Sequence, residues 1–188
     1  MAGWDQVKWA QARQVADLME LDVSLLGDPD ADPESGYRAL REGGDLNAAI
    51  RYLGHALPRF EAVAWAAHLL QEWSRAAKPG VPEQQALDST MRWLGEPTDE
   101  YRRAAHEAAE LTQGPERLLG YAVFMSGGSI SEPDLPPVHP QQQICGSLAA
   151  SAVLAGAYRT ANPGHALATA CDAGEKVAAV GTKALSPP

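Results

Sequence analysis

The stretch RYLGHALPRFEAVAWAAHLLQEW, residues 51–73, holds the densest run of large apolar residues in the chain and two of its five tryptophans. On a helical wheel at about 100° per residue, the apolar side chains after Pro58 cover well over half of the circumference. A helix of this kind is buried on most of its sides. We therefore expect a central helix whose residues Trp65, Leu69 and Trp73 lie in the core of the protein, with a narrow polar strip carrying Glu61, His68, Gln71, Glu72 and Arg75.

The ends of this helix are marked in the sequence. Pro58 predicts a start near Leu57, because proline is tolerated in the first helical turn, where its missing N–H has no intrahelical partner. The run Lys78-Pro79-Gly80 predicts the end. A cation suits the negative end of the helix dipole, and the two residues that follow do not readily extend a helix.

Similar signals divide the rest of the chain. N-cap residues followed by apolar periodicity predict further helices over residues 4–26, 32–40, 45–53, 82–94, 98–111, 115–124, 140–159 and 163–180. The expected polar faces are Asn47, Arg51 and His55 on the helix after Asp45, and Arg102, Arg103, His106, Glu107 and Glu110 on the helix after Thr98. The helix over 140–159 is rich in small residues, which favours close packing against a neighbour.

These signals predict an all-α protein. Alanine is abundant and no segment shows sustained period-two alternation of β-branched residues. At 188 residues the chain fits one domain, a bundle or a stack of helical hairpins with about eight helices. We expect an acidic N-terminal helix and loop over 1–44, a helical core over 45–181 and a frayed tail over 182–188.

Composition argues against several classes of partner and location. A net charge of −9 and a pI near 4.9 oppose binding to a nucleic-acid backbone or to an anionic membrane surface. The N-terminus MAGWDQVKWAQ lacks the apolar core of a signal peptide, and the run 144–158 is too short and too rich in Gly and Ser for a membrane span. We expect a cytoplasmic protein without a cofactor, whose Cys145 and Cys171 are buried free thiols.

Acidic residues are concentrated near the N-terminus. No Lys or Arg lies between Arg13 and Arg38, whereas seven acidic residues do: Asp17, Glu20, Asp22, Asp28, Asp30, Asp32 and Glu34. The segment 17–34 is either a solvated acidic face or a docking site for a basic partner.

Two His-x-x-x-Glu pairs are the candidates for metal or acid–base chemistry. His68 with Glu72, and His106 with Glu110, each share a helix face, and Glu61 lies further along the first face. An enzyme or metal-binding protein that uses Glu61, His68 and Glu72 is one alternative. Ion-paired surface is the simpler interpretation, and no catalytic motif accompanies either pair.

The loop SGGSISEPDLPPVHP, residues 126–140, interrupts the helical pattern with four prolines and two glycines. It is either a strap that ties two helical layers together or a binding loop. If it binds a protein partner, the contact residues that we expect are Ser126, Gly127, Gly128, Ser129, Asp134, Leu135, Pro136 and Pro137.

Three stretches carry a resemblance to a known family: RYLGHALPRFEAVAWAAHL (51–69), SGGSISEPDLPPVHP (126–140) and SAVLAGA (151–157). Together they resemble an uncharacterised bacterial family of small helical proteins whose genes commonly lie among those for type VI secretion. The resemblance covers residues 45–160 and leaves out the acidic N-terminal region.

This resemblance implies an accessory role in a contractile secretion apparatus and no catalytic residues. We accordingly expect a non-enzymatic adaptor or chaperone that binds a secreted effector or a secretion-system component. A structural subunit of the apparatus is a further alternative, and the sequence leaves the oligomeric state open.

Overall fold

The computed structural model describes residues 3–132 and 134–185, and within them the chain is all α-helical. The elements are α1 (Ala12–Leu18), η1 (Val23–Leu26), α2 (Pro33–Glu42), α3 (Leu46–Ala56), α4 (Arg59–Ala77), α5 (Val81–Gly95), α6 (Asp99–Glu110), α7 (Pro115–Phe124), α8 (Gln142–Tyr158), α9 (Pro163–Val180) and η2 (Gly181–Leu185). The prefix η marks a short 3₁₀ helix. This confirms the predicted fold class.

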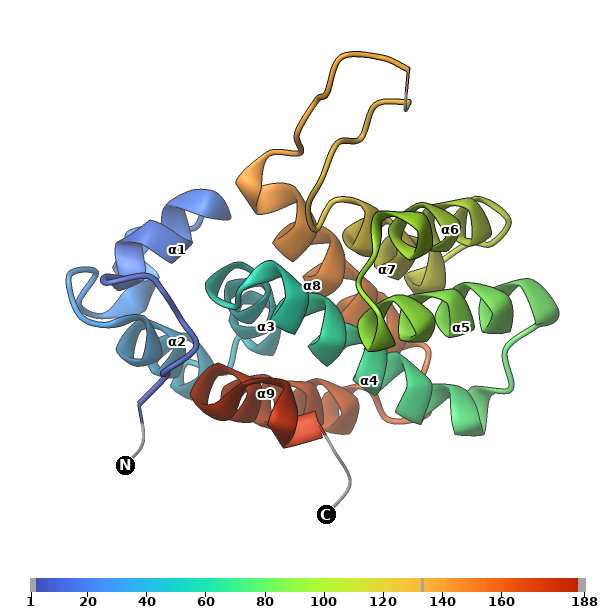
Figure 1. The fold of residues 1–188 in the computed structure, drawn as a ribbon. Helices are drawn as coiled ribbons and strands as arrows, with labels where there is room; N and C mark the ends of the chain where they lie inside the picture. The colour runs from blue at the N-terminus through green and yellow to red at the C-terminus, as the bar shows by residue number, and fades with distance from the viewer. Residues whose placement is uncertain (1–2, 133, 186–188) are drawn as a thin grey trace.

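Helices α4 and α8 lie at the centre of the molecule (Figure 1). Helix α8 packs against α3 and α9 on one side and against α7 on the other, while α5 and α6 complete the second side. The indole of Trp65 is fully buried and its Nε1–H donates to the carbonyl of Ala170 at 3.0 Å, joining α4 to α9. Leu69 is also buried and Trp73 is half-buried.

Local side chains set several of the helix starts. Four polar residues that immediately precede a helix accept a hydrogen bond from a backbone N–H in its first turn: Asp32 before α2, Asp45 before α3, Thr98 before α6 and Asn162 before α9. These contacts satisfy donors that have no intrahelical partner. Lys78 ends α4 in the left-handed conformation.

The N-terminal region differs from the prediction of one helix over 4–26. Only residues 12–18 form an α-helix, and η1 follows after a turn at Glu20, whose φ is 53°. Residues before α1 instead contact distant elements: the N–H of Gln6 donates to the carbonyl of Ala178 at 3.0 Å, and Trp9 Nε1 donates to the carbonyl of His55 at 3.1 Å. The backbone N–H of Gln6 therefore bonds to α9 where a helix would bond it within the segment, and the Trp9 indole ties the segment to α3.

Two further predictions were wrong. Arg102 and His55, expected on solvated faces, are only 4% and 7% exposed. Leu111, which directly follows α6, is 73% exposed, because α6 presents Arg102, Ala105 and Ala109 to the core.

The tail differs as well. Residues 182–185, expected to fray, belong to η2 (Gly181–Leu185), which packs against α4 and α9. The remaining residues of the predicted tail, 186–188, lie outside the described part of the chain. Both cysteines are buried free thiols, as expected, and burial raises the pKa of Cys145 to about 12. None of the helices in the described ranges has the length and apolarity that crossing a bilayer requires.

Candidate functional site

The loop between α7 and α8, residues 126–140, projects away from the helices (Figure 1), and we call it the arm. Pro133 lies outside the described residues. The side chains from Asp134 to His139 are all exposed, and two of them are large aliphatic groups: Leu135 is 60% exposed and Val138 is 54% exposed. The predicted binding residues therefore divide into an exposed tip, with Asp134, Leu135, Pro136 and Pro137, and a base, with Ser126, Gly127, Gly128 and Ser129.

Hydrogen bonds join the two limbs of the arm near its base. The N–H of Ile130 donates to the carbonyl of Val138 at 2.8 Å. The Oγ of Ser129 accepts from the N–H groups of Ser131 at 3.1 Å and of Val138 at 3.2 Å. His139 Nδ1 lies 3.2 Å from the carbonyl oxygen of Gly128. These contacts hold the base in one conformation while the tip stays clear of the body.

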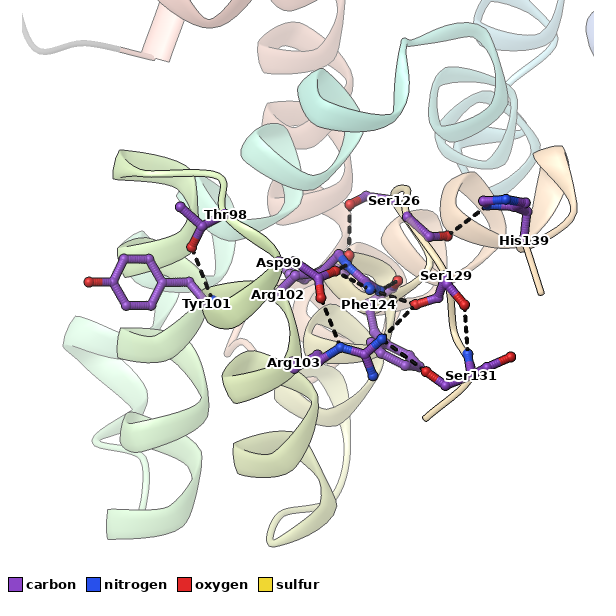
Figure 2. A network of polar contacts seen from close by, with 12 residues as sticks. Thr98, Asp99, Tyr101, Arg102, Arg103, Phe124, Ser126, Ser129, Ser131 and His139 are labelled. Carbon is purple, nitrogen blue, oxygen red and sulfur yellow. Dashed lines mark hydrogen bonds and ion pairs between the residues drawn. The ribbon is translucent and has the colours of Figure 1, made fainter. Parts of the chain in front are cut away.

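Two arginines of α6 fasten this base to the helices, as Figure 2 shows. Arg102 Nη2 donates to the carbonyl of Ser129 at 2.7 Å, and Arg102 Nη1 donates to the carbonyl of Phe124 at 2.5 Å. Arg103 Nη2 donates to the carbonyls of Ser129 at 3.1 Å and Ser131 at 2.9 Å. A guanidinium carries five donors in a planar fork, so each arginine reaches several backbone carbonyls at once.

Asp99 orients both arginines from one helical turn earlier. It accepts from Arg102 Nε at 3.0 Å and from Arg103 Nε at 2.9 Å. Spacings of three and four residues place all three side chains on one helix face. The hydrogen bonds from Arg102 and then Arg103 lower the pKa of Asp99 below its ordinary value, so the carboxylate stays ionised.

The cost of removing the Arg102 guanidinium from water is offset by its contacts with neighbouring groups. Its guanidinium carbon lies 4.7 Å from the centroid of the Phe124 ring, and His106 stacks on the same ring with centroids 4.2 Å apart. The carbonyls, the carboxylate and the ring together replace the lost hydration of the cation. Sequence periodicity placed Arg102 in water because the carbonyl groups that it binds lie 22 and 27 residues further along the chain.

A pocket of about 300 Å³ opens beside the base of the arm, and we call it the basal pocket. It is lined by Lys8, Trp9, Leu18, Gly54, His55, Ala56, Leu57, Pro58, Arg59, Gln142 and Gly146. Arg59 connects the pocket to the arm, since its Nη1 donates to the carbonyl of Ser126 at 3.4 Å. Gln142 begins α8 two residues after the arm ends.

The basal pocket is positively charged in an acidic protein. Lys8 and Arg59 line it, and no Asp or Glu does. Within the described ranges, neither cation has a carboxylate oxygen within 4.0 Å. Helix α8 starts at this pocket with no acidic residue in its first turn and no side-chain cap from Gln141. Its free N–H groups and dipole add to the positive potential.

The inner wall of this pocket forms where α3 and α8 come into backbone contact. A Cβ atom placed on Gly54 would lie 2.6 Å from the carbonyl oxygen of Gly146, so both positions require glycine. This crossing buries His55, whose Nε2 lies 3.2 Å from Ser147 Oγ and whose Nδ1 has no partner in the described structure. Burial, with a smaller contribution from Arg51, lowers the pKa of His55 to about 4.

The other predicted site residues lie elsewhere. His68 and Glu72 both line a groove of about 790 Å³ between α4, α5 and η2, but Glu61 does not line that groove. In the part of the chain that the structure describes, no three His, Cys, Asp or Glu side chains are grouped so that they could hold a metal ion. His106 Nε2 lies 3.6 Å from Glu110 Oε1, which is the ion-pair geometry expected of surface residues.

Several carboxylates of the acidic segment 17–34 cap nearby helices or pair with a nearby arginine. Asp22 caps η1, Asp32 caps α2, and Asp30 pairs with Arg13. The hydrogen bonds to Ser24 and Ser35 lower the pKa values of Asp22 and Asp32. Docking of a basic partner on this segment stays a prediction.

Comparison with known proteins gives one match. A family model described as a family of unknown function, DUF6931, matches residues 36–178, which include the central helix, the arm and α8. No curated protein and no solved structure matches the chain.

Proposed function

We propose that this chain, which belongs to the DUF6931 family of unknown function, is a non-enzymatic interaction module whose arm binds a protein partner. The observation that carries this proposal is the contrast between the two ends of the arm. The base is held by Arg102 and Arg103 of α6, whereas Leu135 at the tip and Val138 beside the base expose their apolar side chains to solvent. A loop that only tied helical layers together would bury its apolar side chains between them.

The chemistry of the tip suits protein recognition. Prolines restrict the backbone to extended conformations, so little conformational entropy is lost when such a segment binds. The anchored base adds to this preorganisation. Proline-rich segments that carry one or two apolar side chains commonly dock in aromatic or apolar grooves. We therefore assign Leu135 and Val138 as the contact residues, with Pro136 and Pro137 maintaining the extended backbone.

The biological setting that we propose is type VI secretion. The support is the resemblance of residues 51–69 and 126–140 to proteins encoded in such gene neighbourhoods, and both stretches lie inside the family match. In this setting the protein acts as an accessory adaptor or chaperone in the cytoplasm. Its partner is a secreted effector or a component of the secretion apparatus.

The test is affinity capture of the tagged protein from its native host, with bound proteins identified by mass spectrometry. We expect an effector or a secretion-system component with the wild type, and at least about tenfold less of it with Leu135→Ser combined with Val138→Ser. Leu111→Ser is the matched control, because Leu111 is 73% exposed on α6, away from the arm.

Two results would contradict the proposal. One is equal recovery of the partner with the tip variant and the wild type. The other is the absence of any secretion-system protein from the captured material, together with unchanged secretion in a deletion strain. An adaptor also leaves the assembled apparatus, so retention of the protein in the purified machine would favour the structural-subunit alternative.

A further inference from the structure

We propose that the tip of the arm also binds the basal pocket of a second copy of this chain, so that two copies exchange arms in a symmetric dimer. The argument begins with the charge of the tip. Glu132 and Asp134 are exposed, and within the described part of the chain neither has a cationic nitrogen within 4.0 Å. Leu135 follows directly and is 60% exposed. The tip thus offers two carboxylates next to an apolar side chain.

The basal pocket offers the complementary groups. Lys8 and Arg59 supply two cations without carboxylate partners, and Trp9, Leu57 and Pro58 supply apolar surface. This local positive charge matters because the chain as a whole carries −9. Two copies repel each other on average because both are acidic. An acidic segment is therefore attracted to a second copy only at a place where local cations outweigh that repulsion. The charge and the apolar surface of the pocket both match the sequence Glu132 to Leu135.

Geometry favours exchange between copies over docking within one copy. The arm leaves the body of its own chain (Figure 1), whereas the basal pocket lies beside the arm's base, where Arg59 contacts Ser126. The N–H of Leu135 donates to the carbonyl of Glu132 at 3.0 Å, so these two residues lie close together at the end of the arm. In the proposed dimer, a two-fold axis beside the arm brings each tip to the other copy's pocket.

Reciprocal exchange closes the assembly at two copies. Each copy gives one arm and receives one, which is the self-complementary arrangement of a two-fold dimer. The two contacts are coupled. Once the first has formed, the second forms within the same complex, where the effective concentration of the other arm is high. The anchored base limits the number of conformations that each arm loses on docking.

The experiment is a charge exchange, read out as molar mass by sedimentation or light scattering across about three decades of protein concentration. We expect the wild type to be a dimer. Arg59→Glu and Asp134→Arg should each weaken dimerisation at least about tenfold, because each places like charges together. The double variant should dimerise again, since Arg at position 134 then meets Glu at position 59 of the other copy.

Arg75→Glu is the matched control for the pocket variant. Arg75 lies on the same helix, is exposed, and does not line the basal pocket. It should leave the dimer intact. Unchanged circular dichroism and melting temperature for Arg59→Glu would show that its fold is intact, because its guanidinium makes one long hydrogen bond to Ser126.

Three results would overturn the inference: a wild type that is monomeric at every concentration, single variants that dimerise normally, or a double variant that is not rescued. A labelled peptide of residues 131–138 identifies the occupant by fluorescence anisotropy. Binding of this peptide to a monomeric wild type would assign the pocket to an acidic segment of another protein and would overturn the second-copy assignment.

This test separates the inference from the proposed function. Leu135 occupies the basal pocket in the proposed dimer and contacts the partner in the proposed complex, so the two binding events compete for the tip. Arg59→Glu removes the pocket contact and leaves the tip free, so a monomeric Arg59→Glu variant that captures more partner than the wild type supports both. A monomeric wild type that captures the same partner overturns the dimer alone.

Discussion

Among the single residues, Arg102 and Arg59 are two of the three arginines that contact the arm, and they differ in how many of their donors are bonded. Arg102 is 4% exposed and binds two carbonyls and the Asp99 carboxylate. Arg59 makes a single hydrogen bond of 3.4 Å to Ser126 and lines an open pocket. Arg102 therefore positions the arm, whereas the Arg59 guanidinium retains donors for a ligand.

The buried His55 should make the stability of the protein fall at acidic pH. Its pKa is about 4 in the folded protein and 6.5 by reference for the unfolded chain, so between these values only the unfolded chain binds the proton. This binding stabilises the unfolded state as the pH falls. The contribution of His55 to the free energy of unfolding is complete above pH 6.5 and decreases by about 3 kcal/mol as the pH falls to about 4.

The measurement is urea unfolding at several pH values within this window. His55→Gln should lose less stability than the wild type on acidification, because Gln does not titrate. His165→Gln is the control at an exposed histidine and should keep the slope of the wild type. Equal slopes for the wild type and His55→Gln would contradict the assignment.

At the scale of secondary-structure elements, helix α8 organises the molecule through its small residues. Gly146 allows α8 to touch the backbone of α3 at Gly54, and Gly156 provides space for the ring of Trp73 on α4. A Cβ on Gly156 would lie 2.9 Å from the Trp73 ring. This confirms the prediction that a helix of small residues packs closely. The α3–α8 crossing also places His55 beside Ser147 and forms one wall of the basal pocket.

Gly54→Ala should therefore destabilise the protein. Alanine normally favours a helix over glycine by up to about 1 kcal/mol. At Gly54, however, the new Cβ would lie 2.6 Å from the carbonyl oxygen of Gly146 and 2.8 Å from Ala150 Cβ. We expect a net loss of about 1–3 kcal/mol by urea unfolding, because α3 and α8 must separate.

The matched control for this crossing is Gly95→Ala in α5. No atom lies within 4 Å of a Cβ built on Gly95, so the change should be neutral or slightly stabilising. A Gly54→Ala protein as stable as Gly95→Ala would show that the helices do not approach as closely as described.

At the scale of the whole molecule, the N-terminal segment is part of the core although most of it lies outside the family match. The match begins at residue 36, yet Trp4 packs on Tyr37 with ring centroids 5.1 Å apart. The hydroxyl of Tyr52 donates to the carbonyl of Ala12 at 3.3 Å. The buried apolar residues of the segment are Ala12, Val15, Ala16, Met19 and Leu26.

Removing residues 1–31 should therefore lower stability substantially. A large apolar side chain stabilises a fold by about 1.5–3 kcal/mol when buried, partly offset by the cost of ordering the segment. We expect a loss of at least about 3 kcal/mol, which corresponds to roughly 6–12 °C in the melting temperature of a domain of this size. Replacing residues 134–137 with Gly and Ser is the control, and it should change the melting temperature little because these four side chains are exposed. A truncated protein that melts with the wild type would refute the integral role of the N-terminal segment.

Local chemistry made the helical framework predictable. Asp32, Asp45, Thr98 and Asn162 cap helices where the sequence indicated, and Trp65 and Leu69 are buried as their periodicity required. These features depend on neighbours within a few residues, so pattern alone reveals them. The arm was also recognisable as a proline-rich interruption. Its separation into an anchored base and an exposed tip was not.

Local patterns along the chain were enough to predict the all-α class, most helix ends and the central buried helix, because hydrogen bonds and periodicity between near neighbours carry that information. They did not reveal which polar residues leave water and which charges come together. Arg102 is buried against carbonyls at the end of α7 and in the arm. His55 is buried where α3 and α8 cross at two glycines, and Lys8 joins Arg59 in one pocket. Burial and charge depend on partners distant in sequence, and the chain brings these partners together only when it folds.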